Sequence, residues 1–157
     1  MKKYKYKNLS SSEVKIKCKD LFMINYIEDE NGNKITIKTL KNERVIFNKN
    51  NYYHTFSYED KMAKTNCIKS RGRIFSYQRA RCVLWIKETL IGNNLDAIRK
   101  DIDPYVYFYD QKEKYLIVLK KLRSGDLLFI THYFVKNSYS LRKIEKKIYL
   151  DNDSSPW

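Results

Sequence analysis

The residues with the most reactive side chains in this sequence are a histidine and a nearby group of arginines. His54 follows Asn51-Tyr52-Tyr53 and precedes a stretch, residues 61–87, that carries eight Lys or Arg and no Asp or Glu. A histidine exchanges protons near neutral pH, so it serves as a general acid or base. RNA cleavage needs a base for the 2′-hydroxyl, an acid for the leaving oxygen and cations around the phosphate. These residue types suit that chemistry; the alternative for His54 is a polar surface residue.

Arginine is concentrated near the end of this basic stretch. The formal net charge is +14, but an AT-rich genome inflates the lysine content, so total charge is weak evidence. Four of the eight arginines lie between positions 71 and 81. A guanidinium grips phosphate with two donors and stacks on bases, so we expect RNA contacts here, with a solvated basic face as the alternative. The expected RNA contacts are Lys69, Arg71, Arg73, Arg81, Lys87, Lys121 and Arg123.

Arg79 differs from its neighbours because it falls within an apolar stripe. Ser76 is a typical N-cap and Gly92 a typical C-terminal stop, so residues 77–91 are expected to form one helix. At 100° per residue, three apolar residues lie within about 40° of Arg79 on this helix: Val83, Ile86 and Leu90. A cation on such a face needs a buried partner or a cleft. Arg79 therefore either holds a structural carboxylate or lines a functional pocket.

A second group of candidate residues lies on a predicted strand, residues 127–135. Side chains alternate between the two faces of a strand. One face is expected to carry Leu127, Phe129, Thr131 and Tyr133, and the other Leu128, Ile130, His132 and Phe134. Thr131 and Tyr133 would then present two hydroxyls together, which suits a phosphate or a sugar. The alternative is a half-buried strand made of good β-formers.

The order of the expected helices and strands predicts an α+β domain, with N-terminal helices packed on a small antiparallel sheet. These elements must position the residues described above. Ser10 and Glu13 form a capping box before a helix over residues 12–26. Ser57 is expected to cap a short helix over residues 58–66. Strands are expected around residues 35–37 and 45–47, separated from the first helix by an Asn31-Gly32 turn, and over residues 105–109, 114–122 and 127–135. Residues 139–149 are basic and compatible with a helix.

Several classes of protein are excluded by composition. No apolar run approaches the roughly 18 residues that span a bilayer, so a cytoplasmic protein without membrane association is expected. Cys18, Cys67 and Cys82 are scattered and are expected to be reduced thiols. They form no zinc site with His54 and His132, and neither a metal nor a cofactor is expected. Without a linker or a repeat, residues 1–157 are expected to form one domain.

The order of these motifs resembles the barnase/EndoU/colicin/RelE-like nuclease superfamily, in particular its phage-associated branches. The resemblance covers about residues 45–157 and leaves the helix and hairpin of residues 1–44 as an extension. It is carried by Phe47–His54, Phe75–Lys87, Tyr115–Lys120, Ile130–Tyr133 and the tail Ser154–Trp157. His132 stands where the family has a small residue, and Thr55-Phe56-Ser57 replaces a more apolar helix start.

The resemblance implies a RelE/EndoU-like fold and a metal-independent endoribonuclease of toxin type. Such an enzyme cleaves tRNA or mRNA and leaves a 2′,3′-cyclic phosphate. His54 would act as acid or base, Thr131 and Tyr133 would contact the scissile phosphate, and Arg79 and Lys120 would stabilise its charge. An acidic antitoxin or immunity protein would cover the same surface.

Two other classes stay open. One is a non-catalytic protein that binds RNA or another nucleic acid on the same scaffold. The other is a phage or host interaction protein whose basic face meets an acidic protein. The enzyme requires that His54, Arg79, Thr131 and Tyr133 meet at one cleft.

Overall fold

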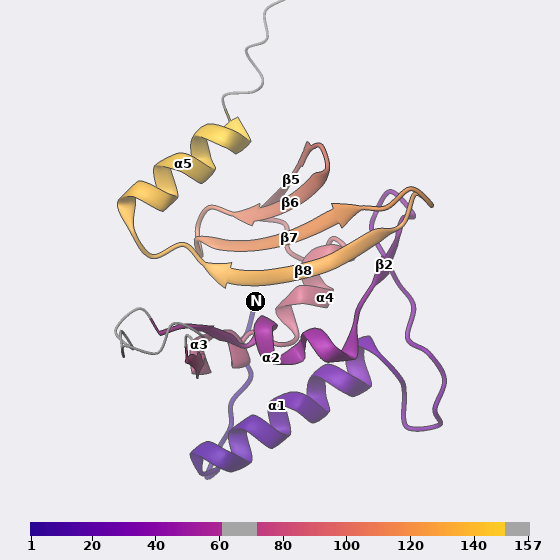
Figure 1. The fold of residues 1–157 in the computed structure, drawn as a ribbon, viewed down its shortest axis with the longest axis vertical. Helices are drawn as coiled ribbons and strands as arrows, with labels where there is room; N and C mark the ends of the chain where they lie inside the picture. Colours follow the sequence, from indigo (N-terminus) through magenta and orange to yellow (C-terminus); the bar gives the residue numbers. More distant parts are fainter. Residues whose placement is uncertain (61–71, 150–157) are drawn as a thin grey trace, which may run out of the picture.

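The structure is a computed structural model that describes residues 1–60 and 72–149. Within these ranges the fold is α+β and is built on a curled sheet with the strand order β1-β2-β8-β7-β6-β5 (Figure 1). Its strands are β1 (Ile37–Lys38), β2 (Arg44–Ile46), β5 (Ala97–Ile102), β6 (Tyr105–Asp110), β7 (Tyr115–Lys121) and β8 (Leu127–Phe134). β2 pairs with β8 in parallel, and the other neighbouring strands are antiparallel. A separate ribbon pairs β3 (Ser57–Glu59) with β4 (Arg73–Phe75).

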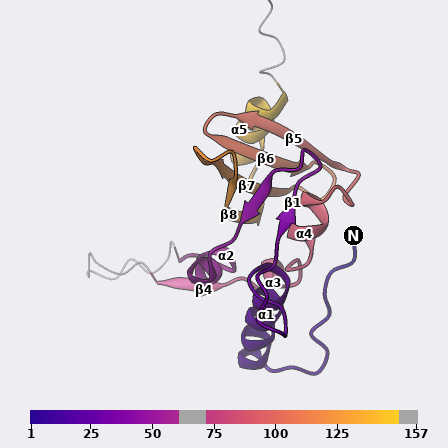
Figure 2. The same ribbon diagram turned by 90° about the vertical axis from the view of Figure 1, so that its right-hand side faces the viewer.

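The helices lie on both sides of the large sheet. They are α1 (Ser11–Tyr26), the 3₁₀ helix η1 (Lys49–Asn51), α2 (Tyr52–Thr55), α3 (Tyr77–Ala80), α4 (Trp85–Leu90) and α5 (Ser138–Tyr149). In both views α1 and α5 lie on opposite sides of the sheet (Figure 1, Figure 2). The α+β class predicted from the sequence is confirmed, and the RelE/EndoU-like arrangement stays a prediction. The prediction of a purely antiparallel sheet is wrong, because β2 pairs with β8 in parallel.

α1 forms as the sequence predicts. The backbone N–H of Glu13 donates to the Ser10 hydroxyl, and the Ser10 N–H donates to the Glu13 carboxylate, which completes the capping box. The side chains at helical spacing, Val14, Cys18, Leu21, Phe22 and Tyr26, are all buried. This apolar stripe attaches α1 to the rest of the fold.

Aromatic rings fill the core between α1 and the sheet. Phe22 lies at its centre, with its ring centroid 5.8 Å from those of Tyr52 and Phe56. Tyr52 begins α2 and Phe56 follows it, and their packing fixes this short helix against α1. Thr55 is buried as well, whereas Tyr53 and His54 are exposed. Phe47 joins the same cluster and stacks on Phe129 of β8 at 4.8 Å. The position of α2 beside β8 follows from this packing.

A smaller core lies under α5, on the other face of the sheet. Tyr109, Leu116, Val135 and Ile148 are buried together there, with Tyr133 packed against them. Successive residues of β7 alternate between the two cores, as a strand buried on both faces requires. Tyr115, Ile117 and Leu119 belong to the helix-side core.

The helix predicted over residues 77–91 is wrong, because the chain forms α3 and α4 with turns between them. The Tyr26 hydroxyl donates to the Val83 carbonyl and accepts from the Lys87 N–H. It therefore takes the place of the i→i+4 hydrogen bond that would have joined Val83 to Lys87. A side-chain group inserted into the series of backbone hydrogen bonds along a helix interrupts that helix.

Two other predictions in this region need correction. The helix expected after Ser57 is wrong for the residues described, because Ser57–Glu59 is strand β3 and residues 61–66 lie outside the described ranges. Strand β5 was not predicted. The Asn31-Gly32 turn, the short strands near residues 37 and 45, and the hairpin of β7 and β8 are confirmed.

A β-bulge at Ile130 changes the faces predicted for β8. It is defined by two register pairs: Val118 with Thr131, and Leu119 with Phe129. Phe129 before the bulge and His132 after it both point into the helix-side core. The prediction that Thr131 and Tyr133 share a face with Phe129 is therefore wrong, because the extra residue shifts the alternation. Thr131 and Tyr133 still share a face with each other, and it is opposite to His132.

In the part of the chain that the structure describes, no helix has both the length and the apolar character needed to cross a membrane.

Candidate functional site

Two cavities lie where β8 meets α2, α3 and the β3–β4 ribbon. The larger, called the His54 cavity here, has a volume of about 470 Å³. It is lined by Asn51, His54, Ser57, Tyr58, Glu59, Arg73, Arg79, Ile130, Thr131 and Tyr133. The other, called the Asn137 cavity, has a volume of about 370 Å³ and shares Tyr58, Arg79 and Tyr133 with it. Four of the five residues predicted as catalytic, His54, Arg79, Thr131 and Tyr133, therefore line one cavity.

His54 is exposed at the end of α2. Its helix is fixed by the burial of Phe56 and the packing of Tyr52, as described above. Asn51 adds a polar connection, because its side-chain amide donates to the Ile130 carbonyl at 2.7 Å. This bond joins α2 to β8 at the bulge. The histidine ring is thus exposed, with an edge contact to the Tyr53 ring, and its helix is fixed beside Thr131.

Arg79 and Arg73 are held side by side by the same piece of backbone. One terminal nitrogen of Arg79 donates to the Ser57 carbonyl at 2.8 Å and to the Thr55 carbonyl at 3.2 Å. Arg73 donates to that Ser57 carbonyl at 3.1 Å and, through Nε, to the Ser57 hydroxyl at 2.8 Å. Ser57 is therefore the common acceptor that brings two guanidinium groups together.

The two arginines form a positively charged site. Arg79 is largely buried, and both burial and the charge of Arg73 lower the pKa of its guanidinium. Among the described residues no carboxylate lies within ion-pair distance of Arg79. Of the two alternatives for Arg79, a structural carboxylate or a pocket, the described residues supply the pocket. Two guanidinium groups this close repel one another, and an anion that binds between them stabilises both.

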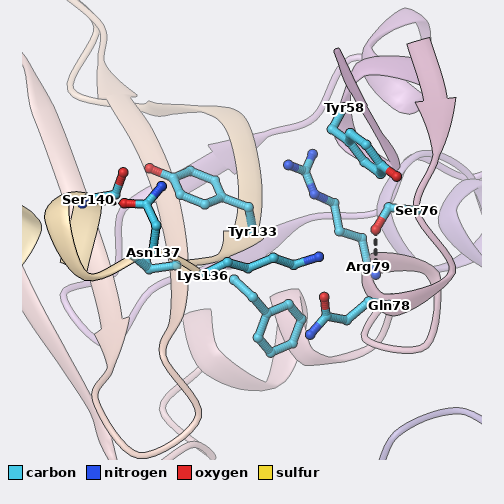
Figure 3. Close-up of a pocket in the computed structure, with 10 residues that line it drawn as sticks. Tyr58, Ser76, Gln78, Arg79, Tyr133, Lys136, Asn137 and Ser140 are labelled. Carbon is cyan, nitrogen blue, oxygen red and sulfur yellow. Dashed lines mark hydrogen bonds between the residues drawn. The ribbon is translucent and has the colours of Figure 1, made fainter. Parts of the chain in front are cut away.

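The hydroxyls predicted to act together do share this cavity. The Arg79 guanidinium carbon lies 5.8 Å from the centroid of the Tyr133 ring, a cation–π distance. Burial raises the pKa of Tyr133 above its ordinary value, and the effect of Tyr107 adds to it, while Arg79 opposes them. The Tyr133 phenol therefore stays protonated at neutral pH and is a hydrogen-bond donor. Figure 3 shows its ring beside the Arg79 guanidinium.

His132 is not part of the site. Its side chain is completely buried between Phe56 and Tyr115, and its Nδ1 shares a hydrogen bond of 2.9 Å with the Tyr115 hydroxyl. Its buried Nε2 has no hydrogen-bond partner among the residues that the structure describes. Burial, with a smaller contribution from Arg79, holds the pKa of His132 well below its ordinary value. His132 is thus a neutral core residue.

None of the other predicted residues within the described ranges, apart from Arg73, lines the His54 cavity. Lys120 is exposed on the face of the sheet that carries Thr131, yet it lines neither cavity. Lys121 instead contacts Asp101 and Asp103 at 3.4 and 3.7 Å. Lys69 and Arg71 lie outside the described residues. Arg81 is exposed near the N-terminus, and Arg123 is exposed in the β7–β8 turn. Lys87 is half-buried on α4.

Arg73 is the one expected RNA contact that lines the His54 cavity among the described residues, and it is half-buried there. Sequence reasoning missed Ser57, since a serine with one carbonyl gives no signal of the two arginines that bind it. It also missed Asn51, although an asparagine three residues before His54 is a plausible positioning residue for that helix.

No group of three or more His, Cys, Asp or Glu that would hold a metal ion occurs within residues 1–60 and 72–149. Of the cysteines, Cys18 and Cys82 are buried free thiols, and Cys67 lies outside the described residues.

Comparisons with models of known families, with curated proteins and with solved structures found no match. The resemblance to the barnase/EndoU/colicin/RelE-like superfamily stays a prediction, so the geometry of the His54 cavity carries the functional argument.

Proposed function

We propose that this protein is a metal-independent endoribonuclease of toxin type that cleaves tRNA or mRNA at the His54 cavity. One observation carries the proposal. Arg73 and Arg79 are fixed together through Ser57, and they share their cavity with an exposed histidine and two hydroxyls. This combination offers cations for a phosphate together with a proton acceptor, as RNA cleavage requires.

In the proposed reaction, His54 takes the proton from the ribose 2′-hydroxyl. The 2′-oxygen then attacks phosphorus, the bond from phosphorus to the 5′-oxygen breaks, and a 2′,3′-cyclic phosphate remains. Arg73 and Arg79 stabilise the charge that develops on the phosphate oxygens. Thr131 positions the phosphate. Tyr133 is protonated, so its hydroxyl donates the proton that the leaving 5′-oxygen takes up, because an alkoxide is a stronger base than a phenolate.

The test is incubation of purified protein with total RNA in EDTA. The wild type is expected to cleave, and His54→Ala and Tyr133→Phe are expected to lose cleavage by a factor of roughly 100 or more. Tyr139→Phe is the matched control, because Tyr139 is 73% exposed and lines neither cavity, so this variant is expected to keep full activity. RNA that stays intact with the wild type overturns the proposal.

A non-catalytic RNA-binding protein is the second candidate. It is favoured by the burial of His132, which leaves His54 as the one histidine lining the cavity within the described residues. Binding through the arginines alone predicts an affinity that falls with salt by roughly 0.7 log units per log unit for each phosphate contact on a single strand. Steep salt dependence with no cleavage selects this candidate. An acidic protein recovered in pull-downs without RNA would instead select the interaction protein.

A further inference from the structure

The Asn137 cavity opens beside the two arginines and has a different chemical character. Its walls include the Tyr58 ring, which is 43% exposed, and the Tyr133 ring. Aromatic side chains at a strand-binding surface stack on nucleobases, and an arginine beside them adds to this stacking. At about 370 Å³, the cavity has room for one base. It shares Arg79 with the phosphate site, so a base held here belongs to a nucleotide next to the bound phosphate.

Asn137 presents a fixed donor to this cavity. Its side-chain oxygen accepts from the Ser140 N–H at 2.6 Å and caps α5. With the oxygen occupied, the orientation of the amide is determined, and its NH₂ group is left to donate. Figure 3 shows the Asn137 oxygen on the side of Ser140 and its nitrogen on the side of Tyr133. The NH₂ group has no partner among the described hydrogen bonds, so it is available to a ligand.

Two cationic side chains, Lys136 and Arg79, line the same cavity as this amide. The Lys136 side chain extends across the cavity toward the segment that carries Gln78 and Arg79 (Figure 3). No carboxylate is among the described residues that line the cavity. The cavity therefore offers donors in excess of acceptors. A base edge that carries acceptors fits it, whereas an edge with an exocyclic amino group brings donor against donor.

Resting on the proposed function, we propose that the Asn137 cavity is a base-selection subsite for keto bases. Guanine presents O6 and N7 as acceptors, and uracil presents O4. Adenine and cytosine carry an amino group at the corresponding position and are disfavoured. The enzyme would then cleave next to guanine or uracil in preference to adenine or cytosine, with Asn137 as the residue that reads the difference.

The test measures binding rather than cleavage, so it does not depend on turnover. Fluorescein-labelled 2′-O-methyl pentanucleotides, which lack the attacking hydroxyl, are titrated by anisotropy in two matched pairs. Uracil is compared with cytosine, and hypoxanthine with adenine, because each pair differs mainly by a keto group in place of an amino group. The wild type is expected to bind the keto member roughly tenfold more tightly in both pairs.

Asn137→Asp is the matched variant. Aspartate is an equally good N-cap and keeps the bond from the Ser140 N–H, so α5 stays folded. It replaces the NH₂ donor with a second acceptor. The keto preference is expected to disappear or to invert toward the amino bases. The added negative charge lowers affinity for both members of a pair equally, so the ratio within a pair reports on the base alone.

Equal affinity of the wild type for both members of each pair overturns the subsite. An unchanged keto preference in Asn137→Asp also overturns the role of Asn137. Either result leaves the proposed function standing, provided that the cleavage assay in EDTA is positive. Conversely, a keto preference that Asn137→Asp removes, together with intact RNA in the cleavage assay, supports the subsite on a protein that binds RNA without cleaving it.

Discussion

His132 gives the stability of this fold a pH dependence that can be worked out from its surroundings. Its imidazole is completely buried, and its pKa in the folded state lies well below the ordinary value of 6.5. In the unfolded chain the same group titrates near that ordinary value. Below a pH of about 6.5, the unfolded chain binds a proton at His132 that the folded protein does not bind. The stability from this group is therefore present above the unfolded pKa and is lost as the pH falls.

The magnitude follows from linkage between protonation and folding. Between about pH 7.5 and about pH 5.5, a group with an unfolded pKa of 6.5 that stays neutral in the folded state removes about 1.4 kcal/mol of stability. The matched perturbation is the double variant Tyr115→Phe/His132→Phe. It replaces both partners of a buried hydrogen bond with apolar rings, which costs far less than leaving one partner unsatisfied.

The assay is urea unfolding of the wild type and the double variant at both pH values. The wild type is expected to lose about 1.4 kcal/mol more than the double variant on acidification. The carboxylates titrate equally in both proteins, so their contribution cancels in the comparison. Tyr115→Phe alone keeps the buried histidine and is expected to show the same pH dependence as the wild type, although its free energy of unfolding is lower because His132 loses its hydrogen-bond partner. Identical pH dependence in the wild type and the double variant would refute the reasoning.

Three further predictions concern other parts of the fold. Arg79→Met removes a largely buried cation, so the free energy of unfolding in urea is expected to change by less than about 1 kcal/mol. RNA affinity measured by anisotropy is expected to fall roughly tenfold. A large loss of stability would contradict this prediction. Burial raises the pKa of Cys18 and Cys82 to about 11 and about 12, so mass spectrometry should find both thiols alkylated far more slowly in the native protein than in urea. Gly92→Ala is expected to cost about 1 kcal/mol in urea unfolding, because Gly92 has φ of 88° and an added Cβ would lie 2.6 Å from Leu40; an unchanged midpoint would argue against this backbone.

The elements that the sequence predicted well are those with local signals. The Ser10–Glu13 capping box predicts α1, and two apolar stretches around a short turn predict β7 and β8. Strand β5 has no such signal, because it is an edge strand and its residues Ala97–Ile102 lack a fully buried face. The break between α3 and α4 was hidden because it depends on Tyr26, a residue 57 positions away from Val83.

The candidate site was predictable in its members more than in its geometry. Arg79 stood out as a cation among apolar residues, and it does line both cavities. The placement of Arg73 beside it depends on Ser57, a contact across the chain that no spacing indicates. The direction of Thr131 depends on the bulge at Ile130, which exists only when β8 pairs with β7. Pairing between distant segments decided both points.

If the His54 cavity cleaves RNA by attack of the 2′-hydroxyl without a metal, the masses of the fragments from a defined RNA incubated with the protein in EDTA will show it. The proposed reaction predicts 5′ fragments that end in a 2′,3′-cyclic phosphate, and no cleavage at a site whose ribose is replaced by 2′-deoxyribose. Fragments that end in a 3′-hydroxyl, cleavage of the deoxy-substituted site, or intact RNA would each contradict it.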